Sequence, residues 1–145
     1  MATITSANSV LMLKIDNLFP VPVPIQGFSA DDIFGTEAIE SAETSMGVDG
    51  NLSAGFVNAA VKWNITLQAD SLSNLVFDNL YIAQKQVQEV YKIQGVVVLP
   101  GLGTKWEMKN GFMTSYQPLP DAKKVLQPRR YQITWESVNP AAALV

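Results

Sequence analysis

The stretch Val61-Lys-Trp-Asn-Ile-Thr-Leu-Gln-Ala69 is the clearest strand pattern of the chain. Its odd-numbered residues are apolar and its even-numbered residues are polar. Because side chains alternate across a strand, this pattern predicts a strand with one face in a core and the other face in water or toward a lumen.

The period changes from two to three or four directly after this strand. Asp70-Ser71 offers an N-cap, and Leu72, Leu75, Val76 and Leu80 follow at helical spacing. The sequence therefore predicts one helix, from about Leu72 to Lys85, that packs on the sheet.

Further strands are expected on both sides of this unit. Alternating apolar residues predict strands at residues 11–15 and 129–138, and a run rich in branched residues predicts another at 89–99, ending in a turn at Pro100-Gly-Leu-Gly103. The run 104–117 is interrupted by Asn110-Gly111, a pair that favours a hairpin turn. Residues 118–128, with three prolines, are expected to form a loop or a short helix.

Two segments have ambiguous patterns. Pro20, Pro22 and Pro24 exclude a central strand and leave an edge strand, an extended arm or a loop. Residues 36–46 suggest a weak strand, with an amphipathic helix as the competitor, and the stretch from Gly47 to Gly55 suggests a glycine-rich loop.

Together these elements predict a mainly β fold. We expect six to eight strands and one principal helix, arranged as an antiparallel β-barrel or sandwich closed by the flanking helix. The 145 residues are enough for a single domain, 1–145, with an extended N-terminal arm, long loops and an apolar C-terminal tail.

The composition excludes many kinds of enzyme. The chain has no Cys and no His, so nucleophile–histidine systems, His or Cys metal sites and disulfides are excluded. Only paired carboxylates remain for acid–base chemistry: Asp31-Asp32, the Glu37/Glu40/Glu43 set and Glu107 with Glu136. Asp49-Gly-Asn lacks the ligand repeat of an EF-hand. The sequence predicts no catalytic residues, no cofactor and no metal.

The tryptophans could form an aromatic floor for a ligand. Trp63, Trp106 and Trp135 all lie in strand patterns, so packing in a core or an interface is favoured. No apolar run approaches the roughly 20 residues of a membrane span, and the N-terminus lacks a positively charged signal region. We therefore expect synthesis in the cytoplasm.

The charges divide unevenly along the chain. Residues 1–80 hold nine acids and two bases, a net charge of −7, and residues 81–145 hold four acids and eight bases, a net charge of +4. This asymmetry either cancels in the folded molecule or supports head-to-tail stacking of an acidic surface on a basic one. Candidate basic assembly-surface residues are Lys123, Lys124, Arg129 and Arg130.

The order of these features resembles that of bacteriophage tail tube proteins. The resemblance lies in the acidic weak strand leading into Met46-Gly-Val-Asp-Gly-Asn51, in Leu99-Pro-Gly-Leu-Gly-Thr-Lys-Trp-Glu-Met108 and in Tyr131-Gln-Ile-Thr-Trp135. It implies a virion protein whose six copies form a ring, with rings stacked into the tube through which DNA leaves. It also implies contacts with sheath, baseplate or initiator, and tape measure proteins, after assembly in the host cytoplasm. The segment with Pro20, Pro22 and Pro24 departs from this pattern.

The resemblance suggests roles for two sets of residues. An acidic lumen repels phosphates, so Glu37, Glu40 and Glu43 are lumen-facing candidates. The loop that begins at Gly47 is expected to reach the adjacent ring, with Gly47, Val48, Asp49, Gly50, Asn51 and Leu52 as candidates for this contact. Alternatives are a tail terminator, a head decoration protein or a monomeric ligand-binding β-barrel.

Overall fold

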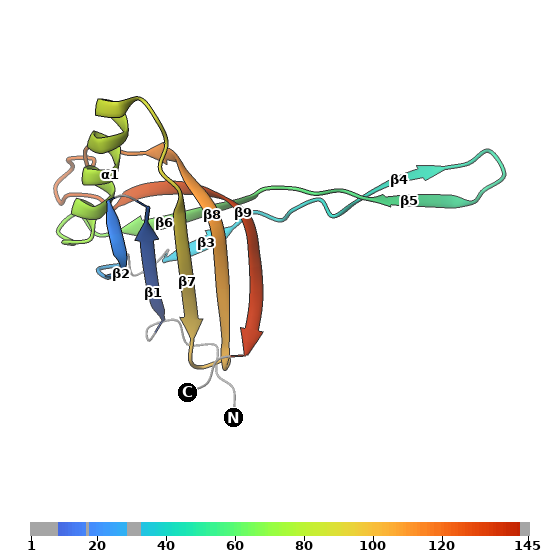
Figure 1. Cartoon of the computed structure of the whole chain (residues 1–145), viewed down its shortest axis with the longest axis horizontal. Helices are drawn as coiled ribbons and strands as arrows, with labels where there is room; N and C mark the ends of the chain where they lie inside the picture. Colours follow the sequence, from blue (N-terminus) through green and yellow to red (C-terminus); the bar gives the residue numbers. More distant parts are fainter. Residues whose placement is uncertain (1–8, 17, 29–32, 143–145) are drawn as a thin grey trace.

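The computed structural model describes residues 9–16, 18–28 and 33–142, and every structural statement below concerns these residues. The elements are β1 Val10–Ile15, β2 Phe19–Ile25, β3 Phe34–Thr36, β4 Ala42–Met46, β5 Leu52–Phe56, β6 Val61–Leu67, α1 Asn74–Val87, β7 Ile93–Leu99, β8 Thr104–Tyr116 and β9 Arg129–Ala142. Figure 1 shows a curved sheet with the helix at one end and a long hairpin projecting away from it. The mainly β prediction with one flanking helix is confirmed.

The main sheet is antiparallel throughout and has the strand order β2-β1-β7-β8-β9-β6-β3 (Figure 1). It is sandwich-like and does not close into a barrel. The strand pattern that opens the sequence forms β6, which pairs with β9 over its whole length, from Val61 opposite Trp135 to Leu67 opposite Arg129. Its alternation is confirmed, because Val61, Trp63, Ile65 and Leu67 are buried.

Strands β8 and β9 carry the sheet around its bend. Met108 faces the core before the bend and Gly111 after it, while β9 changes in the same way between Trp135 and Val138. Asn110 sits at this point with a φ of 51°. The hairpin prediction for Asn110-Gly111 is wrong, because the two halves of β8 pair with β7 and β9 and not with each other.

Gly111 is required by the tryptophan beside it. A Cβ at Gly111 would lie 2.6 Å from Cζ3 and 2.8 Å from Cδ2 of Trp135, whose side chain is fully buried. We expect Gly111→Ala to lower the free energy of unfolding by about 1–3 kcal/mol through overpacking. Urea unfolding checks this, with Gly35→Ala as the control because nothing lies within 4 Å of a Cβ there. Equal effects of the two substitutions would contradict the explanation.

The three prolines belong to the edge strand β2, one of the expected alternatives. They occupy alternate residues of a strand that pairs with β1 on one side only, with Pro24 opposite Met12. Because a proline has no N–H, this spacing removes donors from the outward side while the intervening residues pair with β1. The β2 edge therefore resists further strand addition.

Helix α1 begins two residues later than expected. Residues 72–73 form a turn, in which the Asn74 and Leu75 amides donate to the carbonyls of Ser71 and Leu72 at 3.2 and 3.1 Å. The Ser71 hydroxyl does not cap the helix, because it donates to the carbonyl of Gln26 at 2.5 Å. The helix therefore starts at Asn74 and ends at Val87.

The projecting hairpin changes the expectation for residues 36–55. Thr36 ends β3, and β4 and β5 form a separate two-stranded sheet. The glycine-rich loop is thus shorter than expected, because Leu52 to Gly55 lie in β5. The helical competitor for residues 36–46 is wrong, because residues 42–46 are a strand with partners in β5. Residues 118–128 form a loop without a helix.

Candidate assembly surfaces

We call residues 37–60 the arm. In its paired part, residues directly opposite each other on β4 and β5 share a face. One face holds Ala42, Thr44, Met46, Leu52, Ala54 and Phe56, and the other holds Glu43, Ser45, Ser53 and Gly55. The arm is therefore amphipathic, with one apolar and one polar face.

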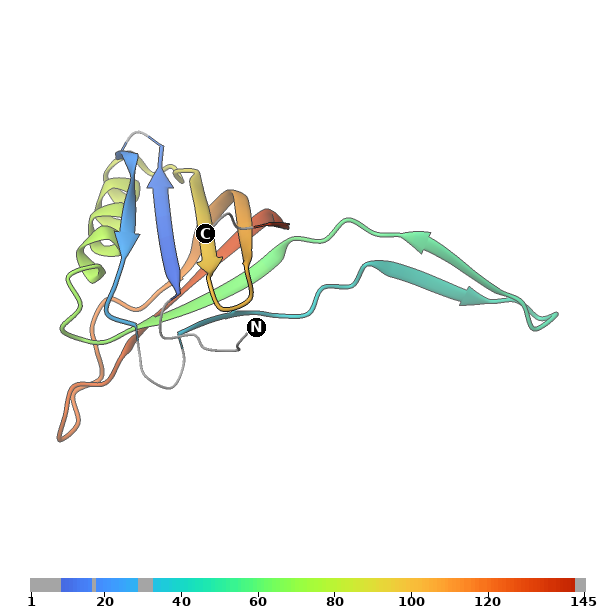
Figure 2. The same cartoon turned by 90° about the horizontal axis from the view of Figure 1, so that it is seen from below.

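No other part of the described chain covers the apolar face of the arm. The exposed fractions are 65% for Met46, 61% for Leu52 and 79% for Phe56. Figure 2 shows both strands far from the main sheet. An isolated two-stranded hairpin is at best marginally stable in water. This face is therefore suited to contact another chain.

The tip of the arm is an ordered turn. The Gly47 amide donates to the Asn51 carbonyl at 2.8 Å, and Gly50 adopts a φ of 85°. The Asp49 carboxylate accepts hydrogen bonds from the backbone and the side chain of Asn51 at 3.1 and 2.8 Å, and these bonds lower the pKa of Asp49. Val48 is fully exposed at the end of the molecule. The six inter-ring candidates thus form one turn and the first residue of β5.

The lumen candidates lie at the root and along the first strand of the arm. Glu37 and Glu40 lie between β3 and β4, and Glu43 lies on the polar face of β4. All three are exposed. Asp31 and Asp32, the adjacent carboxylate pair, lie outside the described residues.

The outer face of the main sheet carries a row of uncharged polar side chains. Thr114 on β8 bonds to Gln132 and Thr134 on β9, both at 3.1 Å, and Gln132 donates to Asn64 on β6 at 3.3 Å. We call these four residues the polar ladder. Sequence analysis identified the wet face of β6, but the partners across the sheet depend on strand order.

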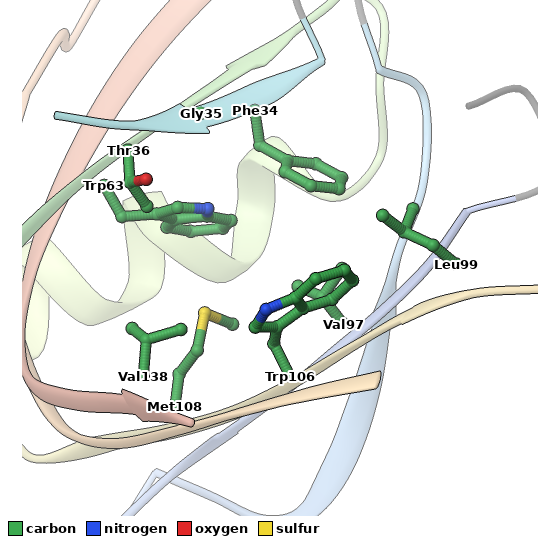
Figure 3. Close-up of a pocket in the computed structure, with 9 residues that line it drawn as sticks. All are labelled: Phe34, Gly35, Thr36, Trp63, Val97, Leu99, Trp106, Met108 and Val138. Atoms are coloured by element: carbon green, nitrogen blue, oxygen red, sulfur yellow. The ribbon is translucent and has the colours of Figure 1, made fainter. Parts of the chain in front are cut away.

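An apolar groove opens at the end of the sheet away from the helix. It has a volume of about 310 Å³, and side chains from both layers point into it (Figure 3). Its lining includes Phe34, Trp63, Trp106, Met108 and Val138. Trp63 and Trp135 are core residues, whereas Trp106 is partly exposed in this groove.

The basic candidates do not form one surface. Lys123, Lys124 and Arg130 are exposed. Arg129 is only 6% exposed, and its Nη2 lies 2.6 Å from Oδ1 of Asp78 on the helix. The expectation of an assembly role for Arg129 is corrected on this ground, because its charge is already paired inside the subunit.

Arg129 is the centre of a network that fixes the helix to the sheet. It donates two hydrogen bonds to the Asp78 carboxylate, and the Tyr116 hydroxyl also donates to Asp78. Tyr131 stacks on Phe77 and donates to Asn74 at 2.7 Å. Burial raises the pKa of Tyr131 and of Tyr116. Desolvation raises the pKa of Asp78, but hydrogen bonds from Arg129 and Tyr116 and the charge of Arg129 outweigh it, so the pKa is lowered.

This network predicts a loss of stability in acid. The folded-state pKa of Asp78 lies below its ordinary value of 3.8, so the unfolded chain binds this proton first as the pH falls. The stabilisation should be complete above about pH 5 and should be lost as the pH falls below about 4. Urea unfolding at several pH values measures it, and Asp78→Asn should flatten this part of the profile. An unchanged profile in that variant would contradict the assignment.

The geometry carries no arrangement typical of catalysis. Within the described ranges, no three Asp, Glu, His or Cys residues are grouped so as to hold a metal ion. The same part of the chain has no helix long and apolar enough to cross a membrane. What stands out is surface without a partner in the subunit, on the arm, in the groove and on the 118–128 loop.

Comparison with solved structures shows a shared fold. A chain from the anti-feeding prophage tube terminating cap matches with a TM-score of 0.65 and 16% identity, covering 99% of this chain and 93% of its own. A chain from the sheath/tube terminator of an extracellular contractile injection system (PVC) matches with a TM-score of 0.65 and 14% identity, over 98% and 99% of the two chains. A chain from the anti-feeding prophage baseplate matches with a TM-score of 0.61 and 13% identity, over 100% and 99%. No curated protein matches the sequence.

The chain is a structural protein of the phage-tail type and a component of a virion tail or a tail-like particle. The family model described as "Tail fiber protein gp32" (E217_Gp32) matches residues 2–139. The chain belongs to this family, which confirms the resemblance to phage tail proteins.

Proposed function

We propose that this chain is a ring-forming subunit of a phage tail tube. Six copies close into a ring, rings stack into a hollow tube, and DNA passes through without specific binding. The observation that carries the proposal is the arm, whose apolar face finds no cover within its own subunit. The shared fold with chains of tube-containing injection systems supports the same kind of assembly.

The polar surfaces suit the wall of such a conduit. The polar ladder presents uncharged groups already bonded to one another, and Glu37, Glu40 and Glu43 add negative charge beside it. We propose that these residues face the lumen, because an uncharged or acidic wall leaves phosphates no cation to bind. The tip, Gly47 to Leu52, then reaches the adjacent ring. Sheath, baseplate or initiator, and tape measure proteins are the proposed partners outside and inside the tube.

A tail terminator is the second candidate. It is favoured by the fold shared with chains from the tube terminating cap and the sheath/tube terminator. A terminator would form a single ring that ends a tube, whereas a tube subunit stacks its rings without limit.

Negative-stain electron microscopy across a concentration series tests both functions. Hollow filaments or stacked six-fold rings are expected for the tube subunit. Single rings at every concentration would favour the terminator. Monomers at every concentration would contradict both.

The lumen assignment predicts a change in DNA binding. Glu40→Lys combined with Glu43→Lys should make assembled tubes retain DNA, because cations in the channel bind phosphates. In co-sedimentation at low salt we expect about a tenfold increase in bound DNA. The matched control is Asp16→Lys with Glu89→Lys, which makes the same charge change away from the arm. Equal DNA retention by both variants would contradict the assignment.

A further inference from the structure

The chain carries a second uncovered surface at the end opposite the arm. We call residues 118–130 the basic loop, and Figures 1 and 2 both place its 118–128 segment across the molecule from the arm. Three large apolar side chains are exposed there, with fractions of 74% for Leu119, 71% for Val125 and 56% for Leu126. Beneath them, Val125 and Leu126 line an open concavity of about 530 Å³ together with Gln68, Ala69, Asp70 and Pro128.

The charges of the two surfaces are complementary. The arm holds Glu37, Glu40, Glu43 and Asp49 and no base, a net charge of −4. The basic loop and the concavity present Lys123, Lys124 and Arg130 against Asp70 and Asp121, a net charge of +1 once Arg129 is excluded as paired. None of these three cations takes part in an ion pair within the described residues.

The shapes of the two surfaces also correspond. Ten residues of extended chain from Glu37 to Met46 span roughly 30 Å, which is about the diameter of a small domain. The arm is therefore long enough to cross a neighbouring copy. Its apolar face would cover the exposed residues of the basic loop while its polar face stays in water.

We infer that the apolar face of the arm docks on the basic loop of a second copy of this chain. The contact is head to tail, because donor and acceptor surfaces lie at opposite ends of one subunit, and such a contact either closes into a ring or continues as a filament. The apolar pairs supply the buried area, and the opposite charges set the direction of approach. The inference rests on the proposed function and specifies its subunit contact. The tip remains free beyond the docked strands.

Disulfide trapping tests the contact directly, since the chain has no cysteine of its own. Thr44→Cys places a thiol on the apolar face of the arm, and Val125→Cys places one on the basic loop. Mixing the two full-length variants under mild oxidation should give a cross-linked dimer. Ser45→Cys is the matched control, because the next residue along the strand points to the other face. A dimer formed equally well by Ser45→Cys, or formed with Trp106→Cys in the apolar groove in place of Val125→Cys, would overturn the inference.

Charge reversal supplies a second test. Lys123→Glu with Lys124→Glu should raise the concentration needed for assembly by about tenfold or more in sedimentation velocity, because acid then faces acid. Lys14→Glu with Lys92→Glu makes the same charge change elsewhere and should leave that concentration within about twofold. Equal shifts in both variants would contradict the docking site.

The two failures can be told apart. Rings or tubes without the Thr44–Val125 cross-link leave the proposed function standing and overturn the docking site. The cross-link without rings or tubes upholds the docking site and contradicts the tube. Loss of both overturns both.

Discussion

Replacing residues 38–60 by a two-residue Asn-Gly turn should give a folded subunit that no longer assembles. The buried hydrophobic core draws no residue from this segment, so its removal leaves the packing of the subunit intact. The Glu37 amide donates to the Lys62 carbonyl at 3.0 Å, so the new ends already lie side by side. We expect the thermal midpoint to change by less than about 4 °C and the rings and tubes to disappear from electron micrographs.

A smaller deletion separates the two parts of the arm. Replacing residues 48–50 alone by a shorter turn keeps the paired strands and removes the tip. Under the proposed function this variant should form rings that do not stack. Long tubes from the tip variant would contradict its inter-ring role, and tubes from the variant without the arm would contradict the role of the whole arm.

Arg129→Met should be the most destabilising single substitution among the charged residues. It leaves the Asp78 carboxylate partly buried without its cation, and breaking a buried pair costs about 3–5 kcal/mol. Urea unfolding followed by circular dichroism measures the loss. Arg130→Met is the control on the neighbouring residue, whose side chain is exposed, and we expect it to stay within about 0.5 kcal/mol of the unchanged chain.

The double variant Asp78→Leu with Arg129→Met tests the cause. Removing both charges should recover part of the lost stability, since no buried charge is left unpaired. Equal losses from Arg129→Met and Arg130→Met, or no recovery in the double variant, would contradict the pairing as the source of the effect.

Strand alternation made much of the fold predictable. The buried faces of β1, β6 and β9 follow directly from period-two patterns, and the helix follows from a change of period after Ala69. Side chains in a strand must alternate whatever the neighbouring strand is, so these features are readable from local sequence. The prolines of β2 likewise reveal an edge, because a missing N–H is a covalent property.

The failed predictions all concern choices between partners. Asn110-Gly111 favours a turn locally, but β7 and β9 flank both halves of β8, and the close approach of Trp135 explains the glycine at position 111. Arg129 and Arg130 are adjacent and identical, yet one is buried against Asp78 and the other is exposed. Sequence alone does not separate them, because the face of β9 that meets the helix is set by how the sheet packs.

The sequence by itself determined a mainly β chain without thiol or imidazole chemistry, with an acidic first half and a basic second half. Those are properties of covalent composition and local period. Tertiary structure alone decided that residues 42–56 leave the sheet as an amphipathic arm, that the basic loop lies at the opposite end, and that the polar ladder crosses three strands. The physical reason is that these features join residues up to 68 positions apart, as from Asn64 to Gln132, and only strand order and packing bring such residues together.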